Sequence, residues 1–67
     1  MKATDEQFTE AIRRLTASMG YPPTVREIGE AVGLASPGSV KRRLAILRDM
    51  GAIEFEDRKP RTVRVVR

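Results

Sequence analysis

The sequence predicts a mainly α-helical domain in which three helices are followed by a small β-hairpin. Three segments combine apolar residues spaced three or four apart with a capping residue in front of them, which is typical of helices. After Gly51 the apolar residues alternate with polar ones, which is the spacing of strands. The 67 residues suffice for one small hydrophobic core, so residues 1–67 are expected to form a single domain.

The first helix is expected at about residues 5–19. Thr4 and Gln7 form a capping box at its start, and acidic residues follow in the first turn, where the helix dipole favours them. Its apolar positions recur at helical steps: Phe8, Ala11, Ile12, Leu15 and Met19. Gly20 and the two prolines after Tyr21 cannot continue this helix, so it ends there.

The second helix is expected at about residues 25–32, directly after the prolines. Thr24 and Glu27 form a second capping box, and Gly33 supplies a terminating residue. The side expected to be buried consists of Val25, Ile28, Ala31 and Val32. Gly29 in mid-helix costs roughly 1 kcal/mol relative to Ala, so we expect it to permit a close helix crossing.

The third helix is expected at about residues 37–50, with Ser36 as its N-cap and Pro37 at its first position. Its apolar stripe is Val40, Leu44, Leu47 and Met50. The short turn at residues 33–36 joins this helix to the second one, and Leu34 should fill that turn from the core side. Two helices joined in this way are typical of a helix-turn-helix.

Two strands are expected at about residues 52–56 and 62–66, separated by the basic loop 57–61. Because the loop contains Pro60 and no Gly, it is longer than a two-residue turn and should project from the body. Three helices followed by such a hairpin make a three-helix winged helix-turn-helix, in which the loop 57–61 is the wing.

Positive charge is concentrated in the C-terminal half of the chain. Residues 1–36 carry four basic and five acidic side chains, whereas residues 37–67 carry nine basic and four acidic ones, and the formal net charge is +4. This asymmetry favours a polyanionic partner.

The composition argues against an enzyme. The chain contains no Cys and no His, so it lacks a disulfide framework, a thiolate, and the commonest metal ligand and general base. We therefore expect no catalytic residue, metal, cofactor or small-molecule substrate. The apolar runs are too short to span a membrane, and residues 1–10 are unlike a signal peptide, which predicts a cytoplasmic protein without a membrane partner.

Basic residues gather on the third helix opposite its apolar stripe, at Lys41, Arg42 and Arg43. An isolated basic triplet is more commonly the solvated face of an amphipathic helix. Beside a basic wing, and next to the small residues Gly38 and Ser39, this triplet favours a helix that enters the major groove of DNA.

The run GYPPTVREI at residues 20–28, followed by the Ser36-Pro37 pair, resembles the N-terminal DNA-binding domain of the LexA repressor family. The resemblance covers nearly the whole chain. It implies that the helix after the Ser-Pro pair reads the major groove while the hairpin rests on the DNA backbone. By position, the base-facing residues are Ser36, Gly38, Ser39, Lys41 and Arg42. We assign contacts with the DNA backbone to Thr24, Arg26, Arg43, Arg58, Lys59 and Arg61.

The sequence departs from the LexA family in two respects. LexA proteins continue through a self-cleavage site into a serine–lysine peptidase and dimerisation domain, whereas this sequence ends at Arg67, so we expect neither function to be encoded in it. The best-known members carry acidic or small polar residues where this chain has Lys41 and Arg42. Since Lys and Arg favour the O6 and N7 acceptors of guanine, a different operator is expected.

The leading hypothesis is a sequence-specific, double-stranded DNA-binding transcriptional regulator of bacterial or phage type, acting as a repressor in the cytoplasm at the nucleoid. One alternative is an architectural or excisionase-like factor that contacts mainly phosphates. Another is a winged-helix protein-interaction module, since fold does not fix function. No segment looks dedicated to dimerisation, so we expect a monomer in isolation, and a dimer on DNA stays open.

Overall fold

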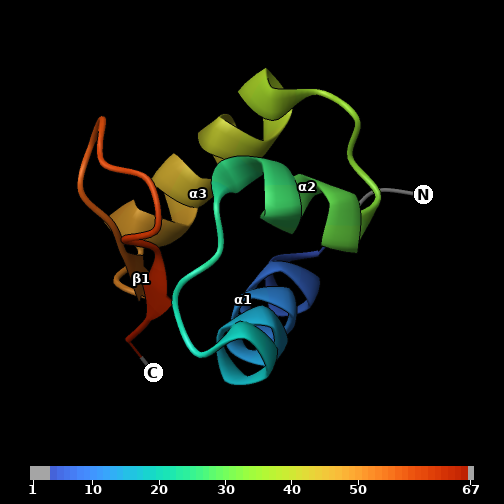
Figure 1. Cartoon of the computed structure of the whole chain (residues 1–67). Coiled ribbons are helices and arrows are strands. Elements are labelled where there is room, and N and C mark those ends of the chain that lie inside the picture. Colours follow the sequence, from blue (N-terminus) through green and yellow to red (C-terminus); the bar gives the residue numbers. More distant parts are fainter. Residues whose placement is uncertain (1–3, 67) are drawn as a thin grey trace.

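The computed structural model of the chain describes residues 4–66 (Figure 1). Its elements, in order, are α1 (Asp5–Met19), α2 (Val25–Val32), α3 (Pro37–Asp49), β1 (Ile53–Glu54) and β2 (Arg64–Val65). The helices cross one another around a shared centre, and the hairpin follows α3 (Figure 1). The predicted three-helix winged helix-turn-helix is therefore confirmed. None of the described helices is long and apolar enough to cross a membrane.

Both predicted capping boxes are present and have the same geometry. Thr4 Oγ1 accepts a hydrogen bond from the Gln7 N–H at 3.1 Å, and Gln7 Oε1 accepts one from the Thr4 N–H at 2.8 Å. The corresponding distances between Thr24 and Glu27 are 3.1 and 2.8 Å. α1 and α2 begin and end at the predicted residues, and each is followed by a glycine in the left-handed conformation.

The core joins all three helices to the hairpin. Its buried side chains are Phe8, Ala11, Ile12, Ile28, Val40, Leu44, Leu47, Ile53 and Val63. Leu34 packs against this cluster from the turn between α2 and α3, as predicted. Burial of these apolar side chains is the main source of stability in a domain of this size.

Two residues predicted on buried faces are exposed. Met50 is 54% exposed, because two successive steps of three residues, from Leu44 to Leu47 and on to Met50, turn its side chain away from the stripe. Ala31 is also exposed. It lies one position before the half-buried Val32, so it points about 100° away around the helix.

Gly29 permits the close crossing of α2 and α3 that the sequence predicts. A Cβ atom at Gly29 would lie 3.0 Å from Val40 Cγ2 and 3.1 Å from the Leu34 carbonyl oxygen. A side chain at this position would therefore require Val40 or the Leu34 backbone to shift. This contact fixes the position of the third helix against the second.

The strands are shorter than predicted. Instead of residues 52–56 and 62–66, the ladder consists of β1 and β2 with two residues each, and Ile53 lies opposite Val65 in antiparallel register. Towards the wing, the Thr62 hydroxyl replaces backbone pairing: Oγ1 accepts a hydrogen bond from the Glu56 N–H at 2.9 Å and donates one to the Lys59 carbonyl at 3.1 Å. A side chain therefore closes the loop where the prediction placed further strand pairs.

Candidate nucleic-acid interface

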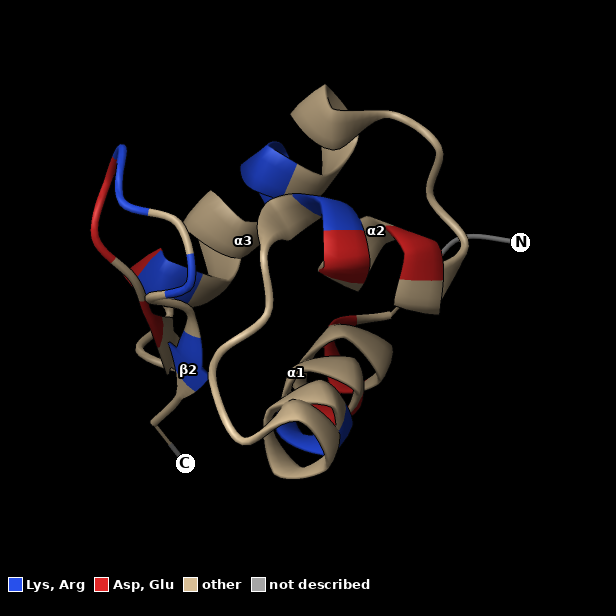
Figure 2. Ribbon diagram, in the orientation of Figure 1, with Lys and Arg blue, Asp and Glu red and all other residues tan. Residues whose placement is uncertain are grey.

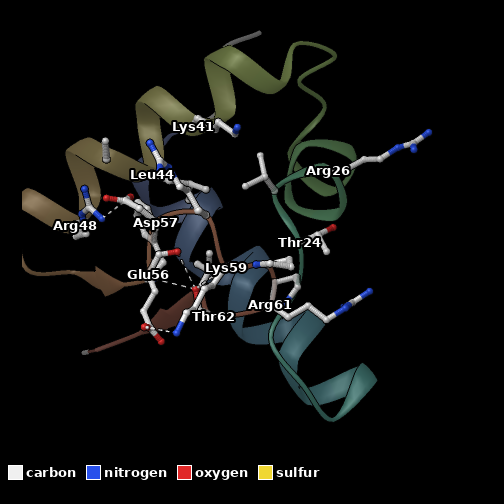
Figure 3. Close-up of a pocket in the computed structure, with 17 residues that line it drawn as sticks. Thr24, Arg26, Lys41, Leu44, Arg48, Glu56, Asp57, Lys59, Arg61 and Thr62 are labelled. Atoms are coloured by element: carbon white, nitrogen blue, oxygen red, sulfur yellow. Dashed lines mark hydrogen bonds and ion pairs between the residues drawn. The ribbon is translucent and has the colours of Figure 1, made fainter.

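A groove of about 540 Å³ opens between α3, the hairpin and the N-terminal end of α2 (Figure 3). Apolar side chains line its floor, among them Leu44 and Val63 from the core. Two acidic residues, Glu56 and Asp57, also line the groove, but basic side chains from all three elements outnumber them: Arg26, Lys41, Arg48, Arg58, Lys59 and Arg61. The groove is therefore suited to an extended anion with some apolar surface.

The structure brings together more than half of the predicted DNA-contacting residues. Those that line the groove are Thr24, Arg26, Lys41, Arg58, Lys59 and Arg61. The remaining base-facing candidates are exposed at the start of α3, outside the groove lining: Ser36, Gly38, Ser39 and Arg42. Arg43 is set apart, because it is directed towards α1.

Four of the candidate cations are exposed and form no ion pair among the described residues: Arg26, Lys41, Arg42 and Arg58. Figure 2 shows basic segments at the start of α2, on α3 and in the wing. Because these charges have no internal partner, a phosphate or a base edge can engage them without displacing one.

Arg43 is committed to the packing of α3 on α1. Its Nη2 donates to Asp5 Oδ1 at 2.6 Å, and its guanidinium carbon lies 5.1 Å from the centroid of the Phe8 ring. The side chain is 28% exposed. This geometry favours a structural role for Arg43 over the predicted contact with the DNA backbone.

Arg61 is fastened to the start of α2. Its Nη1 donates to Glu27 Oε1 at 3.1 Å and to the Pro22 carbonyl at 3.3 Å, while Nη2 donates to Glu27 Oε2 at 3.3 Å. The guanidinium carbon lies 4.7 Å from the centroid of the Tyr21 ring. Residues 57–61 are exposed, as expected for a projecting loop, but the end at Arg61 is tied back to the body. The loop therefore projects with its far end held against α2.

These contacts keep Glu27 ionised. The Thr24 N–H hydrogen bond, and then the hydrogen bond and charge of Arg61, lower the pKa of the Glu27 carboxyl below its usual range, while partial burial acts in the opposite direction. The Glu27 carboxylate in the Glu27–Arg61 pair therefore stays ionised to a lower pH than an ordinary glutamate.

Arg48 also lines the groove, although sequence reasoning did not identify it. Its guanidinium lies 4.2 Å from the centroid of the Phe55 ring, and its Nη1 donates to Asp57 Oδ1 at 3.1 Å. Arg48 lies seven residues after Lys41, so the two side chains project from nearly the same side of α3 two turns apart. This seven-residue spacing was the sequence signal that could have identified Arg48.

The wing contains a further internal pair. Lys59 Nζ lies 3.5 Å from Glu56 Oε1, and both side chains are well exposed. Such exposed pairs contribute at most about 1 kcal/mol, so a phosphate can compete for the lysine. Among residues 4–66, no group of three or more Asp and Glu side chains is placed to hold a metal ion.

Comparison with known proteins gives a consistent assignment. A family model described as the LexA DNA binding domain matches residues 3–62. The LexA repressor of Geobacillus thermodenitrificans is 46% identical over 61 residues, covering 91% of this chain and 30% of that protein. The LexA repressor of Staphylococcus aureus (strain Newman) is 49% identical over 55 residues, covering 82% of this chain and 27% of that protein. The LexA repressor of Thermobifida fusca is 46% identical over 54 residues, covering 81% of this chain and 21% of that protein. The chain spans less than a third of the length of these relatives.

Proposed function

Because the chain belongs to the LexA DNA-binding domain family, we propose that it binds double-stranded DNA at specific sequences and represses transcription there. In this proposal the N-terminal half of α3 enters the major groove, and the wing and the start of α2 lie on the sugar–phosphate backbone. This is a binding function without a chemical step, exercised in the cytoplasm at the nucleoid.

One observation carries the proposal: unpaired cations from three elements surround a single groove. Arg26, Lys41 and Arg58 come from α2, α3 and the wing, yet all three line it. Phosphates of a duplex repeat along its axis, so cations supplied from several directions suit such a ligand. A merely solvated helix face would not require the matching charges of α2 and the wing.

The start of α3 supports base reading. Gly38 and Ser39 are exposed and small, so they permit a close approach to the floor of the major groove. Lys41 and Arg42 follow as long, exposed donors. Since such donors match the O6 and N7 atoms of guanine, we propose an operator that contains guanine where these two side chains reach.

We further propose that the isolated chain is a monomer that binds one half-site, and that two copies on adjacent half-sites form the repressing complex. Pairing of two hairpin edges would bury little surface, because each strand has only two residues. Sedimentation at micromolar concentration tests this, and a stable dimer in the absence of DNA would contradict it.

The test of the main proposal is selection of binding sites from random duplexes with the purified chain, followed by affinity measurement on the selected and on random DNA. The proposal predicts a recovered motif that contains guanine and a clear preference for it. Equal affinity for all duplexes would indicate the architectural alternative. A failure to bind any duplex at low salt would indicate a protein-interaction module.

A further inference from the structure

The two capping boxes differ in one respect that their shared geometry does not explain. The side-chain oxygens of Gln7 and Glu27 each accept a backbone N–H at 2.8 Å. Gln and Glu are equivalent in this motif, and the first box shows that a neutral side chain suffices in this chain. Capping of α2 therefore does not require the negative charge of Glu27, which is available for another contact.

That contact is with Arg61. Glu27 offers both carboxylate oxygens to the guanidinium, at 3.1 and 3.3 Å, in the bidentate arrangement that fits Arg better than Lys. The Tyr21 ring lies beneath the same guanidinium, and the Pro22 carbonyl accepts a further hydrogen bond. Three neighbouring residues thus receive one side chain of the wing, which lies 34 residues further along the chain than Glu27.

The backbone of the wing needs such support. Arg58 and Arg61 have φ values of 65° and 60°, in the left-handed region that residues other than glycine rarely adopt. The loop has only two residues of ladder in each strand to hold it. The Thr62 hydroxyl fixes one part of the loop to Glu56, and the Arg61 contacts fix its end to α2.

We infer that Arg61 is a positioning residue for DNA binding: with Glu27 it forms a latch that sets where Arg58 of the wing meets the DNA backbone relative to α3. Arg61 itself then makes no phosphate contact. This inference rests on the proposed DNA-binding function, and it departs from the prediction that Arg61 binds the backbone directly.

The latch predicts an effect whose sign is opposite to that of simple electrostatics. Glu27→Gln removes a negative charge beside the groove, which by charge alone would strengthen the binding of a polyanion. The same substitution keeps the capping hydrogen bond but weakens the hold on Arg61. If the latch positions the wing, Glu27→Gln weakens DNA binding instead.

The experiment measures the affinity of the full chain for its selected duplex in four forms: wild type, Glu27→Gln, Arg61→Ala and the double variant. We expect each single variant to bind about two- to fivefold more weakly, and the double variant to be no weaker than Arg61→Ala, because both changes open the same latch. Glu54→Gln is the matched control, since Glu54 pairs with Arg64 on the hairpin and does not line the groove. Its affinity should be unchanged or higher.

A second readout follows the latch without DNA. Tyr21 is the only tyrosine of the chain, so its ring resonances report the stacked guanidinium directly. Both single variants should shift these resonances, whereas Glu54→Gln should not. Thermal melts of the same samples identify any variant that fails to fold, and Arg61→Lys then replaces Arg61→Ala, with partial loss of affinity expected.

Tighter binding by Glu27→Gln would overturn the latch. So would a salt slope that becomes shallower by one contact in Arg61→Ala while Glu27→Gln is unaffected, since that pattern marks a direct phosphate contact. A wild-type chain that binds no DNA would instead overturn the proposed function and this role of Arg61 with it.

Discussion

The cations at the start of α3 and most of those in the hairpin are held in different ways, although Arg43 and Arg48 further along α3 also form ion pairs and Arg58 of the wing forms none among the described residues. Lys41 and Arg42 project from a helix and form no ion pair among the described residues, whereas Lys59, Arg61 and Arg64 of the hairpin each pair with a carboxylate. A helix fixes its side-chain positions through its own backbone hydrogen bonds, so it can leave charges unpaired. A hairpin with two-residue strands has little backbone pairing, and it uses some of its charges to hold its shape.

α3 and the hairpin pack on the same hydrophobic core, so a substitution in that core should have the largest effect, because it affects both groups of cations. Leu44 is a residue of α3 that is 1% exposed and forms part of the groove floor. Replacing it by Ala should cost roughly 2–5 kcal/mol, which is comparable to the whole stability of so small a domain. Thermal unfolding followed by circular dichroism measures this. A cooperative melt within a few degrees of wild type would show that the core does not depend on Leu44.

The spacing of α2 and α3 should be the next most sensitive feature, since it sets how far Arg26 stands from Lys41. Gly29→Ala places a methyl group against the Leu34 carbonyl and Val40, which should cost roughly 1–3 kcal/mol. Gly38→Ala is the control for stability, because its nearest heavy atom, Ser36 Oγ, is at an ordinary 3.8 Å. Denaturant melts that show equal loss in both variants would argue against the close crossing.

A smaller effect should appear at acidic pH, because Arg61 of the hairpin is held by the Glu27 carboxylate. The pKa of Glu27 is lowered from its ordinary value of 4.5 in the folded chain, so the unfolded chain binds this proton more readily. Its stabilising contribution is therefore present above that value and lost as the pH falls through the lowered pKa. Melting temperatures measured down to pH 3 should fall more steeply in wild type than in Glu27→Gln. Parallel curves would mean that the Glu27 pKa is unchanged by folding.

The helices could be predicted from the sequence because their signals are local. The capping boxes and the helical spacing of apolar residues lie within a few positions of one another, and the bounds of α1 and α2 match the prediction. Met50 was misplaced because a three-residue step was counted as part of the stripe. The exact rotation of a side chain at a helix end is not encoded in spacing alone.

The hairpin could be predicted only in outline. The pattern of alternating residues indicates two strands, but it does not reveal that the Thr62 hydroxyl takes over from backbone pairing. Nor does it show that Arg61 reaches Glu27, since contacts between distant positions follow from the fold and not from local pattern. Glu27 was interpreted only as a capping residue, and its second role appears once α2 and the wing are side by side. The DNA contacts assigned to Arg26, Lys41, Arg42 and Arg58 stay predictions.

The central claim is that the start of α3 reads bases whereas the wing binds phosphates. The most direct measurement is a salt titration of binding to the selected and to a random duplex by wild type, Arg42→Ala and Arg58→Ala, which remove two exposed and unpaired charges. Arg58→Ala should weaken binding to both duplexes alike and make the log–log salt slope shallower by about 0.9. Arg42→Ala, and likewise Lys41→Ala, should cost roughly 1–3 kcal/mol on the selected duplex and little on random DNA. Equal losses on both duplexes for the α3 variants would contradict the account, because α3 would then be only an electrostatic surface.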